Sequence, residues 1–196
     1  MRRWVLLIIV GTAALVAVIV IGLNQAGEGK GPSQPTVSHI SAAELHAKLD
    51  GSPAALAAVH SQANDLIPGA RTALLKRVDA LRGHPIVINV WAAWCGPCRV
   101  ELPVVQRASL NWGKRVAFLG VDLKDNRGEA QRLLRDIPLT YPSYEDPDGK
   151  VYNGYKLLGT PTTIYYNAAG KQTYIHTGPY ESREDLDADI KRYALS

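Results

Sequence analysis

The sequence predicts an α/β fold with a mixed central sheet, built from about the last 115 residues of the chain. Two short apolar runs, over residues 86–90 and 116–121, have the length and composition of strands buried on both faces of a sheet. A stretch with helical spacing follows each run. Residues 162–167 and 172–177 then alternate in polarity around Ala168-Ala169-Gly170, which is typical of an antiparallel hairpin.

Helical periodicity places the remaining elements of this domain. A helix-compatible stretch covers residues 99–110, between the two apolar runs. Amphipathic spacing predicts further helices over 130–137 and 151–158, and a last one that opens near Ser182. Parallel βαβ units followed by a hairpin and a helix form a domain large enough to bury its own core.

The first 23 residues have the composition of a transmembrane anchor. Residues 4–23 carry no charge, and at about 1.5 Å rise per residue they span roughly the 30 Å core of a bilayer. Arg2 and Arg3 precede them and the next basic residue is Lys30, so the positive-inside bias predicts a cytoplasmic N-terminus. We expect a single-pass protein of the cell membrane whose α/β domain is extracytoplasmic. A cleaved signal peptide, which leaves a secreted protein, is the alternative.

Between the anchor and the α/β domain, the sequence predicts a linker and a helical extension. Residues 24–38 are rich in Gly, Pro, Ser and Gln, which is typical of a flexible tether. The segment 39–82 has the periodicity of three helices, over residues 41–49, 53–64 and 70–81. It carries no chemical motif, so we expect it to pack against the domain formed by 83–196.

The charge of the exported part gives no reason to expect a nucleic-acid partner. Without Arg2 and Arg3, the 22 basic residues become 20 against 18 acidic ones, a net charge of +2. The apolar and charged fractions, 46% and 20%, are those of an ordinary globular protein.

Both cysteines lie in the segment 94–98, between a predicted strand and a predicted helix. A structural disulfide is one interpretation, but a bridge that closes so short a loop restrains the unfolded chain little. A cysteine at a helix N-terminus lies beside unpaired N–H groups and the positive end of the helix dipole, which lower the pKa of a thiol. We therefore expect a redox-active pair in which Cys95 attacks and Cys98, one turn further along, resolves the mixed disulfide.

This strand-CxxC-helix arrangement resembles the thioredoxin superfamily, and Trp94-Cys95-Gly96-Pro97-Cys98 is thioredoxin's own active-site sequence. The resemblance covers roughly residues 83–196. The predicted anchor, Glu101-Leu102-Pro103 and an extra βα unit before Thr160-Pro161 are similar to the exported TlpA-like and ResA-like branch. Members of that branch are thiol-disulfide oxidoreductases, several of which serve cytochrome c maturation. The resemblance implies dithiol-disulfide exchange without a cofactor or a metal.

The resemblance also implies a proton acceptor for Cys98. In thioredoxin a buried Asp on the central strand has this role, but the matching residue here is Asn89, which cannot titrate. Glu101 occupies the position of a glutamate in the ResA-like branch, three residues after Cys98 on the same helical face. We expect Glu101 to accept the proton; the alternative is an exposed helix carboxylate.

A substrate-binding surface around the dithiol follows from the same resemblance. Superfamily members keep a cis proline before the strand that faces the dithiol, which implies a cis Thr160-Pro161 bond and a backbone at Thr160 free to pair with an extended substrate. Trp94 is expected to shield the dithiol and to contact partners, whereas Trp91 is equally suited to the core. The expected substrate-binding residues are Trp94, Gly96, Pro97, Thr160 and Pro161.

The direction of electron flow is less constrained by the sequence. The Gly-Pro dipeptide matches that of thioredoxin, which is strongly reducing. A difference of about 30 mV in reduction potential, however, corresponds to only about 1.4 kcal/mol, and groups around the dithiol can shift the potential by that much. We expect a reductant of disulfides in extracytoplasmic proteins that receives electrons from a membrane protein; an oxidant or isomerase is the alternative. A copper- or zinc-handling module is a weaker one, because His176 is the only histidine after Cys98. A catalytically silent adaptor protein is the third alternative.

Overall fold

The structure, a computed structural model, describes residues 42–196. The predicted anchor over residues 1–23 and the predicted linker over 24–38 lie outside the described residues. Among residues 42–196, no helix is both long enough and apolar enough to cross a membrane.

A six-stranded sheet in the order β1-β4-β3-β2-β5-β6 forms the centre of the described unit. The parallel strands β2 (Ile86–Trp91), β3 (Ala117–Leu123) and β4 (Ser143–Asp146) continue into the antiparallel pair β5 (Thr162–Tyr166) and β6 (Gln172–Thr177). Every residue of β2 and β3 is buried, as their uninterrupted apolar runs predict. The predicted mixed sheet with a terminal hairpin is confirmed.

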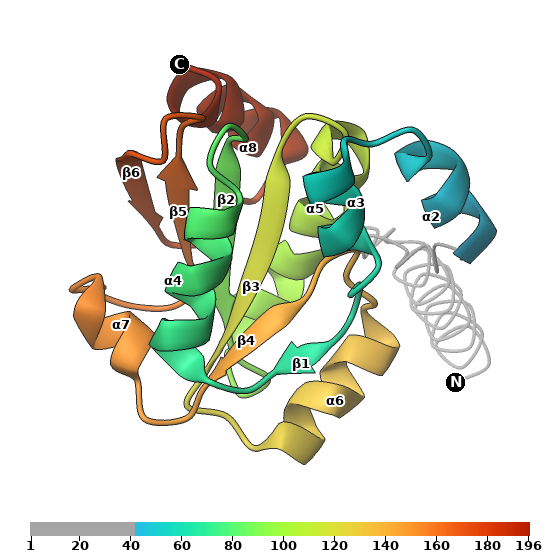
Figure 1. Cartoon of the computed structure of the whole chain (residues 1–196). Helices are drawn as coiled ribbons and strands as arrows, with labels where there is room; N and C mark the ends of the chain where they lie inside the picture. Colours follow the sequence, from blue (N-terminus) through green and yellow to red (C-terminus); the bar gives the residue numbers. More distant parts are fainter. Residues whose placement is uncertain (1–41) are drawn as a thin grey trace, which may run out of the picture. The chain divides into compact units, whose positions relative to one another are not determined.

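Helices alternate with the strands, and Figure 1 shows α4 in front of the sheet with α5 and α8 behind it. The last helix begins where the sequence predicts, because the hydroxyl of Ser182 accepts a hydrogen bond from the Asp185 N–H and caps it. The helical elements are α2 (Ala42–Leu49), α3 (Ala54–His60), α4 (Ala70–Ala80), α5 (Gly96–Trp112), α6 (Arg127–Asp136), α7 (Lys150–Gly154), α8 (Arg183–Asp189) and the π-helical turn η2 (Ile190–Ala194).

The segment 39–82 departs from the all-helical prediction. Between α3 and α4 it forms the strand β1 (Leu66–Ile67), which pairs in parallel with β4 at the edge of the sheet. Leu56 and Leu74 from this segment are completely buried in the same core as the central strands. A two-residue strand is too short to show an alternating pattern, which is why periodicity misses it. The sheet therefore begins before residue 83.

The helix predicted over 151–158 is also shorter in the structure. It ends as α7 at Gly154, and Lys156 then adopts a positive φ of 54°, which a helix does not tolerate. Val151 is buried as expected, but Leu158 is 87% exposed in the loop that leads to Thr160. The apolar spacing in this segment is therefore not that of one continuous helix.

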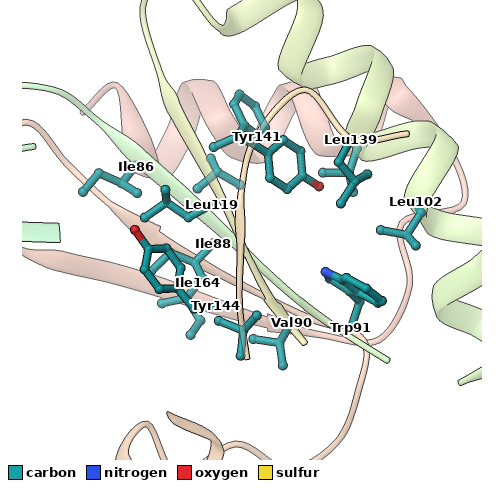
Figure 2. Packing of buried hydrophobic residues seen from close by; sticks show 14 of the residues in the cluster. Ile86, Ile88, Val90, Trp91, Leu102, Leu119, Leu139, Tyr141, Tyr144 and Ile164 are labelled. Atoms are coloured by element: carbon teal, nitrogen blue, oxygen red, sulfur yellow. The ribbon is translucent and has the colours of Figure 1, made fainter. Parts of the chain in front are cut away.

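Apolar side chains on both sides of β2 fix the strand that carries the active-site turn. Figure 2 shows Ile86, Ile88 and Val90 of β2 among the labelled core residues, and Leu102 on the side of Trp91. Trp91 at the end of β2 is completely buried, and its indole N–H donates to the Ser143 hydroxyl at 3.1 Å. Trp91 is thus a core residue, and the turn after it is held by a rigid strand.

Candidate active site

The dithiol lies at the N-terminus of α5. Cys95 is the N-cap residue, and its Sγ accepts a hydrogen bond from the Cys98 N–H at 3.2 Å. The two cysteines form a disulfide, with Cys95 4% exposed and Cys98 completely buried. A Cys95 thiolate at this position is stabilised by the same N–H group and by the helix dipole. The geometry therefore gives Cys95 the outer position and Cys98 the inner one.

The sequence between the cysteines explains why the helix begins there. Pro97 lies in the first turn, where its missing N–H removes no intrahelical hydrogen bond. Gly96 and Pro97 are both exposed, and a Cβ at Gly96 would meet no other atom within 4 Å. The two residues predicted to bind substrate therefore lie on the surface beside Cys95.

Thr160 and Pro161 lie across from the dithiol, and the peptide bond between them is cis, as the resemblance implies. The carbonyl oxygen of Thr160 lies 3.7 Å from Cys95 Sγ, and its hydroxyl oxygen lies 3.5 Å from Cys98 Sγ. That hydroxyl donates to the carbonyl of Val90 at 3.1 Å. The structure thus brings the main chain and the side chain of Thr160 against both sulfur atoms.

A cavity of about 390 Å³ is lined by Trp94, the residue before Cys95, and by Thr160, which contacts both sulfur atoms. Trp94 forms one wall; its side chain is exposed, and its indole N–H donates to the carbonyl of Lys124 at 3.3 Å. Lys124 has a positive φ of 47°, and neither it nor Tyr152 belongs to a motif that sequence reasoning could have found. The lining residues are Trp94, Leu123, Lys124, Tyr152, Gly159 and Thr160.

Glu101 is completely buried, so the alternative of an exposed helix carboxylate is wrong. The side-chain amide of Asn89 donates to its Oε2 at 2.9 Å, and the backbone N–H of Tyr180 donates to its Oε1 at 3.2 Å. Burial raises the pKa of Glu101 to about 7, although both hydrogen bonds act in the opposite direction. A carboxyl group with this pKa can exchange a proton near neutral pH.

A second buried carboxyl group, which sequence reasoning missed, lies at the end of β3. Asp122 is opposite Trp91 in the sheet and only 3% exposed. Burial, followed by the neighbouring carboxylates of Asp125 and Glu145, raises the pKa of Asp122 to about 8. Asp125 also accepts a hydrogen bond from the Ala93 N–H in the turn before the dithiol. Asp122 lies one residue beyond the predicted apolar strand, so the apolar pattern of that strand does not predict that Asp122 is buried.

His176, the only histidine after Cys98, stacks on the ring of Tyr180 and lies 3.9 Å from a carboxylate oxygen of Asp189. In the described part of the chain, no three His, Cys, Asp or Glu side chains are grouped so that they could hold a metal ion.

A mixed sheet with a CxxC disulfide at a helix N-cap, facing a cis proline, defines a thioredoxin-like thiol-disulfide oxidoreductase. The AhpC/TSA family model matches residues 69–176, more than half of the chain, and the chain belongs to this thioredoxin-like family.

Curated relatives agree with this class. The chain is 30% identical over 175 residues to the thiol:disulfide interchange protein DsbE of Pseudomonas fluorescens biotype C, which covers 87% of this chain and 82% of that protein. It is 33% identical over 120 residues to DsbE of Allochromatium vinosum, where the match covers 59% of this chain and 65% of the relative. The thiol-disulfide oxidoreductase ResA of Oceanobacillus iheyensis is 29% identical over 96 residues, which are 48% of this chain and 50% of that one.

Solved structures share the fold. The structure of MTB dsbF matches with a TM-score of 0.54 and 26% identity, over 58% of this chain and 84% of that one. A thiol:disulfide interchange protein of Chlorobium tepidum matches with a TM-score of 0.53 and 25% identity, over 59% and 83% of the two chains. The predicted family, the thioredoxin-like α/β fold with its mixed sheet and the enzyme class are confirmed.

Proposed function

We propose that this protein is a reductant of disulfides in extracytoplasmic proteins. The main support for the proposal is that one helix carries the outer Cys95, the inner Cys98 and Glu101. Glu101 is a buried carboxyl group whose pKa is about 7. Such a set has a nucleophile, a resolving thiol and a group that accepts the resolving thiol's proton.

The reaction runs through a mixed disulfide. The Cys95 thiolate attacks one sulfur of a client disulfide, and the other client sulfur leaves as a thiolate that takes up a proton. Glu101 takes the proton from the Cys98 thiol, and the Cys98 thiolate then attacks Cys95 Sγ. The second client sulfur leaves as a thiolate and takes up the proton held by Glu101. The client thus gains two electrons while the enzyme ends with the Cys95–Cys98 disulfide seen in the structure.

The surroundings of the dithiol support a client that binds in an extended conformation. The carbonyl of Thr160 faces Cys95 Sγ beside the cavity that Trp94 borders. A client segment paired with the main chain at Thr160 brings its own disulfide against Cys95, and the Trp94 ring supplies apolar contact. Gly96 and Pro97 leave this approach open, because neither has a bulky side chain.

The location and the electron donor are part of the proposal. A reductant that works outside the cytoplasm needs a supply of electrons, and a membrane protein that carries them across the bilayer is the expected donor. An anchor over residues 1–23 would hold the enzyme close to such a donor. Similarity to proteins named DsbE and ResA, together with the ResA-like sequence features, supports clients in cytochrome c maturation.

Trapping in membranes tests the direction of electron flow. In a Cys98→Ser variant, Cys95 remains joined to its client, so the captured proteins can be identified and the redox state of wild-type Cys95 recorded by thiol labelling. We expect a mostly reduced wild-type pool and clients that accumulate as disulfides when the protein is deleted. A wholly oxidised pool that captures newly exported reduced proteins would show an oxidant instead.

A further inference from the structure

The loop formed by residues 178–180 contacts both sides of the site, although it comes from the C-terminal part of the chain. The N–H of Gly178 donates to the carbonyl of Pro161 at 3.0 Å, and the N–H of Tyr180 donates to Glu101 Oε1 at 3.2 Å. Gly178 has a φ of 107°, a conformation that favours glycine. One short loop thus joins the cis-proline segment to the buried carboxyl group.

The side chain of Tyr180 fixes this loop in place. Its hydroxyl bonds to the hydroxyl of Tyr165 at 2.7 Å and donates to the carboxylate of Asp189 in α8. Its ring stacks on His176 of β6, with 4.1 Å between the ring centroids and 20° between the planes. Only 3% of Tyr180 is exposed, so these contacts leave the residue little freedom.

We propose that Tyr180 is a positioning residue for Glu101: its anchored phenol holds the loop so that the backbone N–H stays directed at the carboxylate. This inference rests on the proposed role of Glu101 as the proton acceptor of Cys98. Substitution of the Tyr180 side chain does not remove its backbone N–H. The side chain therefore acts on Glu101 only through the position in which it holds that N–H.

The groups around Glu101 explain why one N–H group matters. Besides Asn89 and Tyr180, the buried phenols of Tyr141 and Tyr165 lie close enough for electrostatic interaction with the carboxylate, and Cys98 lies one turn away on α5. The Tyr165 hydroxyl bonds to Tyr180, and the Tyr141 hydroxyl has no hydrogen-bond partner among the described residues, so neither phenol donates to the carboxylate. The two hydrogen bonds therefore carry much of the stabilisation of the charged form.

The groups that face Tyr180 are Tyr165 of β5, His176 of β6 and Asp189 of α8. Loss of the phenol hydroxyl removes the hydrogen bonds to Tyr165 and Asp189 and leaves the stacking on His176. A displaced N–H stabilises the carboxylate less, so the pKa of Glu101 must rise further. Less of the proton acceptor is then ionised at neutral pH, and the step that resolves the mixed disulfide slows there.

The Tyr180→Phe variant tests the inference, because it keeps the ring and removes the hydroxyl. The titration of the Glu101 carboxyl carbon is followed by NMR on the oxidised protein, and the pH profile of the resolving step is measured in parallel. We expect the Glu101 midpoint to rise by about half a unit or more and the pH profile to move with it.

Tyr166→Phe is the matched control. It removes a tyrosine-tyrosine hydrogen bond of 2.8 Å, to Tyr155, from the strand that also carries Tyr165. Because that bond lies outside the contacts of Tyr180, the Glu101 midpoint should stay at its wild-type value. In a Glu101→Gln background, Tyr180→Phe should no longer move the pH profile.

An unchanged Glu101 midpoint in Tyr180→Phe overturns the inference. If that variant does not fold, Asp189→Ala, which removes one partner of the phenol, replaces it and should raise the midpoint by a smaller amount; no change there overturns the inference equally. The NMR titration needs no turnover. If the wild-type protein fails to reduce disulfides, the proposed function fails while the positioning of Glu101 is still measured.

Discussion

The side-chain amide of Asn89 lies 2.9 Å from a carboxylate oxygen of Glu101, and this hydrogen bond joins β2 to the dithiol helix α5. In thioredoxin, which the active-site sequence resembles, the strand supplies the carboxyl group. Here the strand supplies a neutral donor and the helix supplies the carboxyl group. A titrating group is thus present near Cys98, but it comes from a different element.

Glu101→Gln should abolish the titration near pH 7 in the resolving step. Burial sets the pKa of Glu101 to about 7, and glutamine cannot accept the proton. Stopped-flow measurement of mixed-disulfide resolution should show a loss of roughly 10²-fold at pH 7.5. The attack of Cys95 on a small disulfide serves as the internal control, since it does not need deprotonation of Cys98. An unaltered pH profile would remove Glu101 from the mechanism.

The stability of the protein should fall as the pH rises above about 4.5. The pKa of Glu101 goes from 4.5 in the unfolded chain to about 7 in the folded protein, so the folded state binds more protons between these values. The resulting stabilisation is complete below pH 4.5 and is lost by about pH 7, amounting to about 3 kcal/mol. Asp122, whose pKa is raised to about 8, acts in the same direction.

Chemical denaturation of the oxidised protein at pH 5 and pH 8 measures this loss. Between these two pH values, the loss of stability should be about 2.5 kcal/mol smaller in Glu101→Gln than in the wild type. Asp122→Asn should reduce it as well, and the reductions should add in the double variant. Equal losses in all four proteins would contradict the raised pKa values.

Trp94→Ala should weaken client binding without a loss of stability. The ring is 60% exposed, so its removal should change the free energy of unfolding by no more than about 0.5 kcal/mol. We expect KM for a protein disulfide such as insulin to rise by roughly 10-fold with kcat little changed, because one aromatic contact is lost. Reduction of a small-molecule disulfide, which does not span the cavity, is the control. Equal effects on both substrates would place Trp94 in the chemistry instead.

Leu74→Ala should destabilise the whole fold, although it lies in the segment predicted as an extension. Leu74 of α4 is completely buried in the common core, so its truncation should cost about 2–5 kcal/mol. Leu158→Ala, at a residue that is 87% exposed, is the matched control and should stay within about 0.5 kcal/mol of the wild type. Thermal unfolding should remain a single transition. Separate melting of residues 42–82 would show instead that this segment is an independent unit.

Local patterns in the sequence determined the parts of this protein that depend on near neighbours. The apolar runs of β2 and β3 and the hairpin of β5 and β6 are each visible within a few residues. The dithiol, its strand-to-helix setting and the family resemblance also lie in one continuous stretch. These features need no knowledge of distant residues, because propensity and periodicity act over one or two turns.

The completion of the site depends on contacts between residues far apart in the sequence. Glu101 is 79 residues from the N–H of Tyr180 that binds it, and its burial depends on the elements that close around it. Strand β1 forms because it pairs with the edge of β4, and a run of two residues is too short to predict that pairing from the sequence. Burial and long-range hydrogen bonds set the pKa of a carboxyl group, so the sequence identified Glu101 but not the environment that brings its pKa to about 7.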